Sequence, residues 1–92
     1  MTQAQMFNFE EEIDNQKINR KNRGYEYLVV AMDLPRESTE HMMDLYAKIA
    51  ERKGTTAANV ERLLRYVKNK SRQLKWLTNR EMIENFIIKT FY

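Results

Sequence analysis

The 92-residue sequence contains no cysteine, one proline, two glycines and one histidine. Without cysteine, the chain can form neither a structural disulfide nor a thiolate metal site. The single histidine, His41, has no second histidine at the spacing that a metal ion requires. So few glycines and prolines disfavour short strands joined by tight turns and favour helices linked by brief loops. We therefore expect a small all-α domain of about four to five helices, without a metal or other cofactor.

Long apolar runs are also missing. No stretch approaches the roughly 18 apolar residues that a membrane-spanning helix requires. The N-terminus reads "MTQAQMFNFEEE" and has no basic segment ahead of an apolar one, as a signal peptide would. No glycine-rich phosphate loop and no pair of acids within an apolar pocket pattern is found. The sequence thus predicts a cytoplasmic protein that makes no membrane contact and is not an enzyme.

The charged residues are clustered, although the net charge of +3 is mild. Residues 1–15 contain four acids and no base, whereas residues 17–23 contain four bases and no acid. A second basic block follows Glu61 and consists of Arg62, Arg65, Lys68, Lys70, Arg72 and Lys75. Such clustering is typical of a surface that binds a polyanion. A solvated helix face that keeps a small protein soluble would give the same pattern.

The chain divides near residue 22. We expect residues 1–22 to be weakly structured or docked on the remainder, with Met6, Phe9 and Ile13 on the apolar side of a short acidic helix. Residues 23–92 form the predicted domain. Its first element, "GYEYLVVAMDL", has apolar residues at helical spacing and must stop before Pro35, although two adjacent valines leave a strand open.

Two amphipathic helices are predicted next, over residues 39–53 and 57–73. Ser38 or Thr39 is expected to cap the first, and Gly54 to end it in the left-handed conformation. Thr56 is a suitable cap for the second, so only a short glycine-containing turn separates the two helices. The second helix carries an apolar arc of valines and leucines opposite a basic, amide-bearing face. This arrangement is that of a helix-turn-helix, which favours DNA binding.

The last helix is predicted from a capping box. Thr78 and Glu81 have the required spacing, and the residues that follow are more apolar than a helix of this length needs. We expect the 79–91 helix either to close the core or to cover a partner subunit as a homodimer surface.

Particular residues strengthen the helix-turn-helix hypothesis. The string "KIAERKGTTAANVERLLRY" resembles "IAKKFNTTASRVERAIRH" in the C-terminal effector domain of the sporulation initiation regulators, stage zero sporulation protein A. The shared residues are Ile49, Ala50, Thr55, Thr56, Ala57, Val60, Glu61, Arg62 and Arg65. Upstream, "GYEYLVVAM" is similar to the family's "GYxYLxxAI", and downstream "LTNREMIENFI" is similar to its "PTNSEFIA". The resemblance covers about residues 23–90.

The resemblance implies an all-helical domain that binds a short DNA box, with neighbouring copies in tandem. It places Arg62 and Arg65 on the recognition helix as readers of bases or phosphates, and Glu61 beside them. Three departures change that expectation. Asn59 stands where the family has a basic residue, so we expect one contact, and with it the preferred box, to be lost or changed. Most of the segment that contacts RNA polymerase in the family is missing between the recognition helix and the last helix, and we expect no phospho-acceptor receiver domain.

We therefore predict a transcription regulator that binds double-stranded DNA sequence-specifically, with residues 57–73 as the recognition helix. The expected base-contacting residues are Arg62, Arg65, Asn59 and Asn69, and Glu61 is expected either to accept from cytosine N4 or to hold an arginine in place. The expected phosphate-contacting residues are Lys53, Thr55, Thr56, Lys68, Lys70 and Arg72. The alternative is a protein-interaction module that has kept the fold but not DNA binding, and that contacts RNA polymerase or antagonises a regulator.

Overall fold

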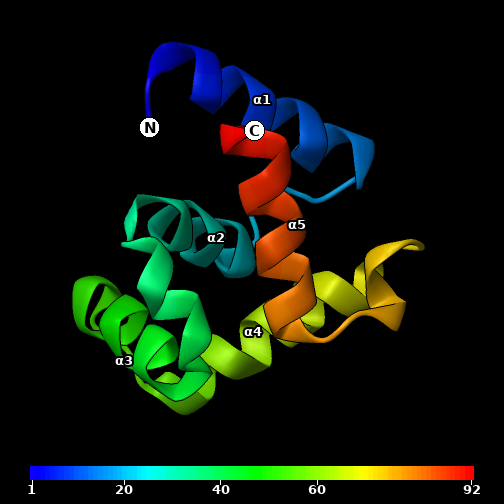
Figure 1. Cartoon of the computed structure of the whole chain (residues 1–92). Helices are drawn as coiled ribbons and strands as arrows, with labels where there is room; N and C mark the ends of the chain where they lie inside the picture. The colour runs from blue at the N-terminus through cyan, green and yellow to red at the C-terminus, as the bar shows by residue number, and fades with distance from the viewer.

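The computed structural model describes all 92 residues and contains helices only (Figure 1). Five α-helices follow one another: α1 (Gln3–Asn15), α2 (Arg23–Asp33), α3 (Met42–Lys53), α4 (Ala57–Lys70) and α5 (Asn79–Phe91). Two short 3-10 helices, η1 (Arg36–Glu40) and η2 (Leu74–Trp76), lie between them. The predicted all-α class is confirmed, and the strand alternative for residues 24–34 is excluded. None of the helices has the length and apolar character needed to cross a membrane.

The core is one cluster of 17 buried apolar residues to which all five α-helices contribute. Helices α2 and α3 both pack against α4, while α1 lies across α5 at the other end of the molecule (Figure 1). The N-terminal helix supplies two of the most deeply buried side chains, Phe9 and Ile13. The Phe9 ring lies 5.7 Å from that of Phe86 on α5 and 6.1 Å from that of Tyr25 on α2, measured between centroids.

Helix α2 crosses α4 closely because its second residue, Gly24, has no side chain. A Cβ atom on Gly24 would lie 2.1 Å from the Val67 Cγ2 atom and 2.7 Å from the Leu63 carbonyl oxygen. Only glycine fits at this crossing. The Asn22 side chain caps the helix by accepting a 2.9 Å hydrogen bond from the Gly24 backbone amide.

Helix α3 starts later than the sequence indicates. The expected caps, Ser38 and Thr39, lie in η1, and the α-helix begins at Met42 with His41 at its N-cap and no side-chain capping bond. Both hydroxyls have other partners. Lys48 Nζ donates to Ser38 Oγ at 3.2 Å, and Thr39 Oγ1 donates to the Arg36 carbonyl at 2.9 Å. The expected end is confirmed, since Gly54 has φ 66° and ψ 41°, the left-handed conformation.

Helix α4 begins where expected but ends at Lys70, three residues before the predicted boundary at residue 73. Its N-cap is Thr56, whose side chain accepts a hydrogen bond from the Asn59 amide. Its C-cap is Ser71, which is buried with an extended backbone. Arg72 therefore lies beyond the helix and not on its face.

Helix α5 has the predicted capping box between Thr78 and Glu81. Met82, Ile83 and Phe86 on its inner face are fully buried, so this helix does close the core. Ile88 remains 57% exposed on its outer face. At its C-terminal end, the Arg36 guanidinium lies 4.0 Å from the centroid of the Phe91 ring.

Candidate nucleic-acid interface

The outward face of α4 is set by the residues that the helix buries. Val60, Leu64 and Val67 recur at helical spacing and are at most 1% exposed. The opposite stripe consists of Ala58, Arg62, Arg65 and Asn69, all of which are exposed. Because the two stripes lie on opposite sides of one helix, fixing the first against the core directs the second to solvent.

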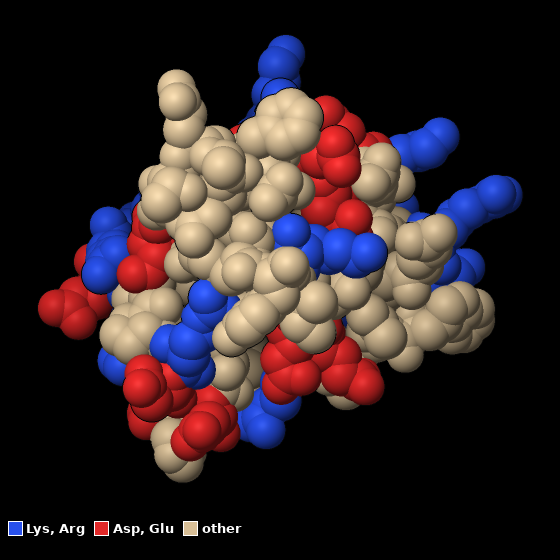
Figure 2. Space-filling view, turned by 45° about the horizontal axis from the view of Figure 1, so that its top comes forward, with Lys and Arg blue, Asp and Glu red and all other residues tan.

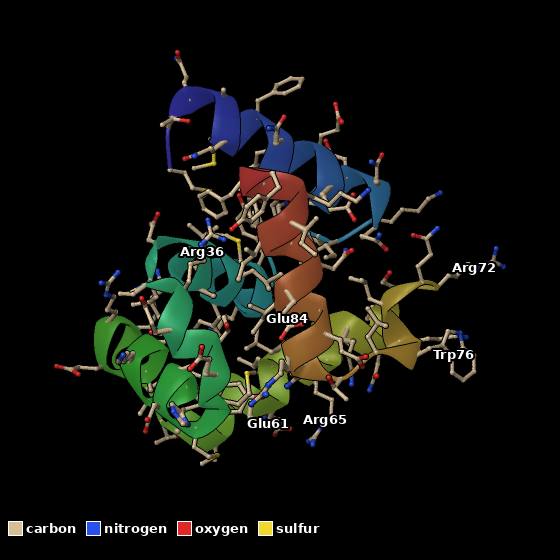
Figure 3. The ribbon with its side chains drawn as sticks, in the orientation of Figure 1. Arg36, Glu61, Arg65, Arg72, Trp76 and Glu84 are labelled. Carbon is tan, nitrogen blue, oxygen red and sulfur yellow. The ribbon has the colours of Figure 1, made fainter.

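Arg62 and Arg65 are exposed, and each contacts one side chain of its own helix. Arg62 Nη2 donates a 2.6 Å hydrogen bond to Asn59 Oδ1, one turn earlier. Arg65 Nη1 lies 3.0 Å from Glu61 Oε1, and the Arg65 side chain is 52% exposed. Ion pairs this exposed contribute only about 0–1 kcal/mol, so a stronger partner can displace the carboxylate. Figure 3 shows Arg65 and Arg72 directed away from the body of the molecule.

Asn59 lies at the centre of a small hydrogen-bond network. Its Nδ2 atom donates to Thr55 Oγ1 at 2.9 Å and lies 3.4 Å from the Tyr27 hydroxyl oxygen on α2. Its Oδ1 atom accepts the bond from Arg62. The side chain therefore links α2 and the turn to the first exposed arginine, and its amide is not a free group at the surface.

The remaining predicted residues surround the exposed stripe. Lys53 and Thr55 lie at the turn, where they line a shallow hollow with Arg23, Glu26 and Tyr27 of α2. Thr56 is exposed and Lys68 is half-buried. Lys70 and Arg72 are exposed at and beyond the C-terminal end of α4. None of the lysines at 53, 68 and 70, nor Arg72, forms an ion pair.

One edge of the α4 face continues onto α5. Glu61, Arg65 and Lys68 line a shallow hollow together with Thr78 and Arg80 from the start of α5. Asn79 fixes this junction. It is 8% exposed, and its Nδ2 atom lies 3.1 Å from the Tyr46 hydroxyl oxygen and 3.3 Å from the Glu61 carbonyl oxygen. Burial raises the pKa of Tyr46.

Arg80 is a cation of this edge that sequence reasoning missed. Its Nη2 atom donates to the Glu40 carbonyl at 3.0 Å, yet the residue is exposed beside Lys68 and Arg65. No local pattern in the sequence signals this position, because only the packing of α5 against α4 brings Arg80 to this edge.

The charge pattern differs elsewhere on the molecule. On the face shown in Figure 2, which brings the α1 end forward, acidic and basic side chains are interspersed. On α4, Glu61 is the one acid beside Arg62, Arg65, Lys68 and Lys70. A predominantly basic surface on a helix whose opposite side is anchored in the core is suited to contact a polyanion.

Comparison with known families agrees with this geometry. The sequence matches the family described as the C-terminal domain of the sporulation initiation factor Spo0A over residues 10–91. The chain belongs to this family. Neither the curated proteins nor the solved structures give a match.

The family is one of DNA-binding effector domains and is not catalytic. Membership supports transcription regulation and sporulation as the functional setting of the chain. The match starts within α1 and ends at the last residue of α5, so it covers the second part of α1 and all of the other helices.

Proposed function

We propose that this protein binds double-stranded DNA sequence-specifically and regulates transcription, with α4 in the major groove. The observation that carries the proposal is the pair of exposed arginines, Arg62 and Arg65, on the side of α4 opposite the buried Val60 and Leu64. In a helix-turn-helix, the second helix enters the groove while the first crosses the backbone. Helix α3 is the first helix of the pair and crosses the DNA backbone.

Each group has a role that follows from its chemistry. Arg62 and Arg65 pair with guanine O6 and N7, because a guanidinium presents two parallel donors. Asn69 lies on the same stripe and pairs with adenine. Glu61 orients Arg65 until DNA replaces it. The groups assigned to phosphates are Lys53, Thr55, Thr56, Lys68, Lys70 and Arg72.

Asn59 has a different role from the basic residue that the resemblance implies for its position. Because its amide oxygen accepts from Arg62 and its amide nitrogen donates to Thr55, we assign it to hold Arg62 in place and not to read a base. The preference at the base pair that Arg62 contacts then depends on Arg62 alone.

Selection of bound sites from random duplex DNA tests the proposal. The protein is expected to enrich one short box, and its affinity for that box is expected to fall steeply between about 50 and 200 mM salt, because counterions are released when phosphates are contacted. Failure to bind any duplex at about 50 mM salt would contradict the proposal.

A second candidate, a protein-interaction module, is favoured by exposed apolar residues outside α4. Phe7 on α1 is 65% exposed and Ile88 on α5 is 57% exposed. In this alternative the partner is a second copy of the chain, through residues 79–91, or a regulator or RNA polymerase. It predicts association that depends little on salt and no enrichment of DNA.

A further inference from the structure

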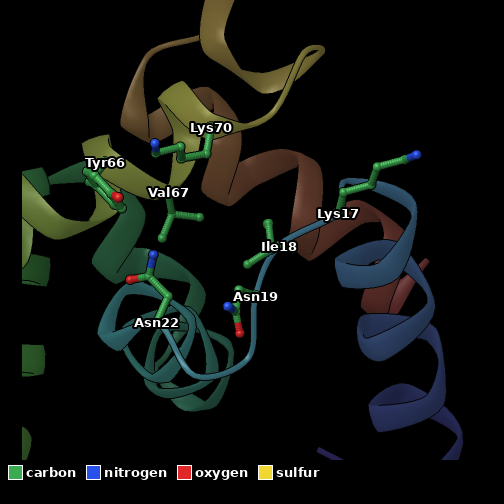
Figure 4. A pocket seen from close by; sticks show the side chains of 7 residues that line it. All are labelled: Lys17, Ile18, Asn19, Asn22, Tyr66, Val67 and Lys70. Carbon is green, nitrogen blue, oxygen red and sulfur yellow. The ribbon is translucent and has the colours of Figure 1, made fainter.

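The basic block at residues 17–23 lies beside the C-terminal half of α4. The connector between α1 and α2 borders a hollow of about 350 Å³ whose lining includes Lys17, Asn19, Asn22, Tyr66 and Lys70 (Figure 4). A second hollow of about 170 Å³ shares Lys17 and Lys70 and continues to Arg72. Two basic segments that are far apart in the sequence therefore form one continuous surface.

Most of the cations on this surface are not neutralised by the protein. Arg20 is occupied, because its Nε atom lies 2.7 Å from Glu10 Oε2 and its Nη2 atom 2.9 Å from Asp14 Oδ1. It thereby offsets the carboxylates at the end of α1 that face the connector. Lys17, Lys70 and Arg72 line the two hollows and form no ion pair. Lys21 and Arg23 of the connector are also exposed and without an ion pair.

The connector is held in one conformation. The Gln16 side chain, immediately before it, accepts a 2.7 Å hydrogen bond from the Ser71 hydroxyl at the end of α4. Lys17 has φ 56°, and the Ile18 amide donates to the Ile13 carbonyl at 3.1 Å. Farther along, Asn19 Oδ1 accepts from the Lys21 amide, and Asn22 caps α2. A surface ordered before binding loses little conformational entropy when it meets its ligand.

The position of this surface identifies its ligand. Tyr66 and Lys70 lie one turn apart on the edge of α4 that faces the connector, next to the exposed stripe of Arg62 and Asn69. When a helix fills a major groove, the residues beside its inserted stripe meet the phosphates that border the groove. Lysine ammonium groups, asparagine amides and a tyrosine hydroxyl are all suitable donors to phosphate oxygens.

We propose that the connector at residues 17–23 and the end of α4 form a second contact to the DNA backbone, outside the helix-turn-helix. Lys17, Lys21 and Lys70 hold phosphates of the strand that borders the groove, and they add affinity without adding sequence information. This inference rests on the proposed function, since it requires a duplex bound along α4.

Charge-removing substitutions in the connector test the inference. The plot of log affinity against log salt has a negative slope, and each lost phosphate contact reduces its magnitude by about 0.9. Lys17→Gln and Lys21→Gln are therefore each expected to make the slope shallower by about one, and the double substitution by about two. The box selected from random DNA should stay the same. Lys17→Arg should keep the parental slope, which separates loss of charge from local distortion.

The matched control is Lys89→Gln, an exposed lysine in the last turn of α5, away from α4. It is expected to leave the slope unchanged. If the parent protein binds its box with a steep salt dependence and the connector variants have the parental slope, the second contact is overturned while the proposed function stands. If the parent binds no duplex, both are overturned.

Discussion

The Ser71 hydroxyl donates a 2.7 Å hydrogen bond to Gln16 Oε1, joining the end of α4 to a residue 55 positions earlier. Gln16 Nε2 in turn donates to Glu12 Oε2 and to Gln73 Oε1, both at 3.0 Å. Asn85 of α5 completes the network by donating to the same Glu12 oxygen at 3.2 Å. This network joins α1, the end of α4 and α5, and it places the connector beside the proposed recognition helix.

Removal of one hydroxyl from this network should destabilise the fold. Ser71→Ala leaves the buried Gln16 oxygen without its donor, and we expect a loss of about 1–3 kcal/mol in the free energy of unfolding, measured by urea titration. Asn8→Ala, an exposed substitution on α1, is the control and should change it by less than about 0.5 kcal/mol. Equal stabilities for the two variants would show that the network does not hold α1 in place.

Gly24→Ala tests the close crossing of α2 and α4. The added methyl group would lie 2.1 Å from Val67 Cγ2, so the helices must separate, and we expect a loss of about 1–3 kcal/mol in thermal or urea unfolding. Adding Val67→Ala to this variant should restore only part of the lost stability, because the Leu63 carbonyl oxygen still lies 2.7 Å from the new methyl group. A Gly24→Ala variant as stable as the parent would contradict the described packing.

Arg62 and Lys70 should differ in what they contribute to DNA binding. Arg62→Ala is expected to cost about 1–3 kcal/mol on the selected box and to relax the preference at one base pair. Lys70→Ala should weaken every sequence alike and lower the salt slope by about one. Fluorescence anisotropy on the selected and a scrambled duplex measures both quantities. Parental behaviour of both variants would exclude α4 as the DNA-contacting helix.

Asn59→Lys tests the assignment of Asn59 to hold Arg62. The substitution restores a basic residue of the kind that the resemblance implies, and it removes the 2.6 Å bond to Arg62. We expect selection from random DNA to return a different box. An unchanged box would show that the side chain at position 59 does not influence readout.

Tyr25 should make the stability of the fold depend on pH in the alkaline range. Burial and, second, its hydrogen bond to Glu10 raise the pKa of Tyr25 from 10.0 to about 12. Because the folded pKa lies above the unfolded one, the contribution of Tyr25 to stability is complete below pH 10 and declines as pH rises from 10 to 12.

Urea midpoints between pH 9 and pH 11.5 check this effect. The parent should lose stability over this range more steeply than Tyr25→Phe, which has no hydroxyl to ionise. Tyr92→Phe, at an exposed position, should follow the parent. Identical slopes for the parent and Tyr25→Phe would contradict the part-buried bond between the Tyr25 hydroxyl and Glu10.

Local signals in the sequence located the helix-turn-helix. The features that the sequence did not reveal, two helix ends and the place of Arg80, depend on contacts between separate segments. Gly54 and Thr56 determine the turn through their own backbone and side chain, so the turn was predictable. The end of α4 depends on Ser71 and Gln16, and the start of α3 on Ser38 and Lys48. Such pairs form only when the chain folds. Arg80 was missed for the same reason, since tertiary packing alone brings it beside Arg65.

The most direct test of the central claim is to map which backbone amides change chemical shift when the selected duplex is added to isotope-labelled protein. We predict that the largest changes lie at Arg62, Arg65 and Asn69 on the exposed face of α4, with smaller changes in the connector at residues 17–23. Changes confined to α1 and the outer face of α5, with α4 unaffected, would contradict the account.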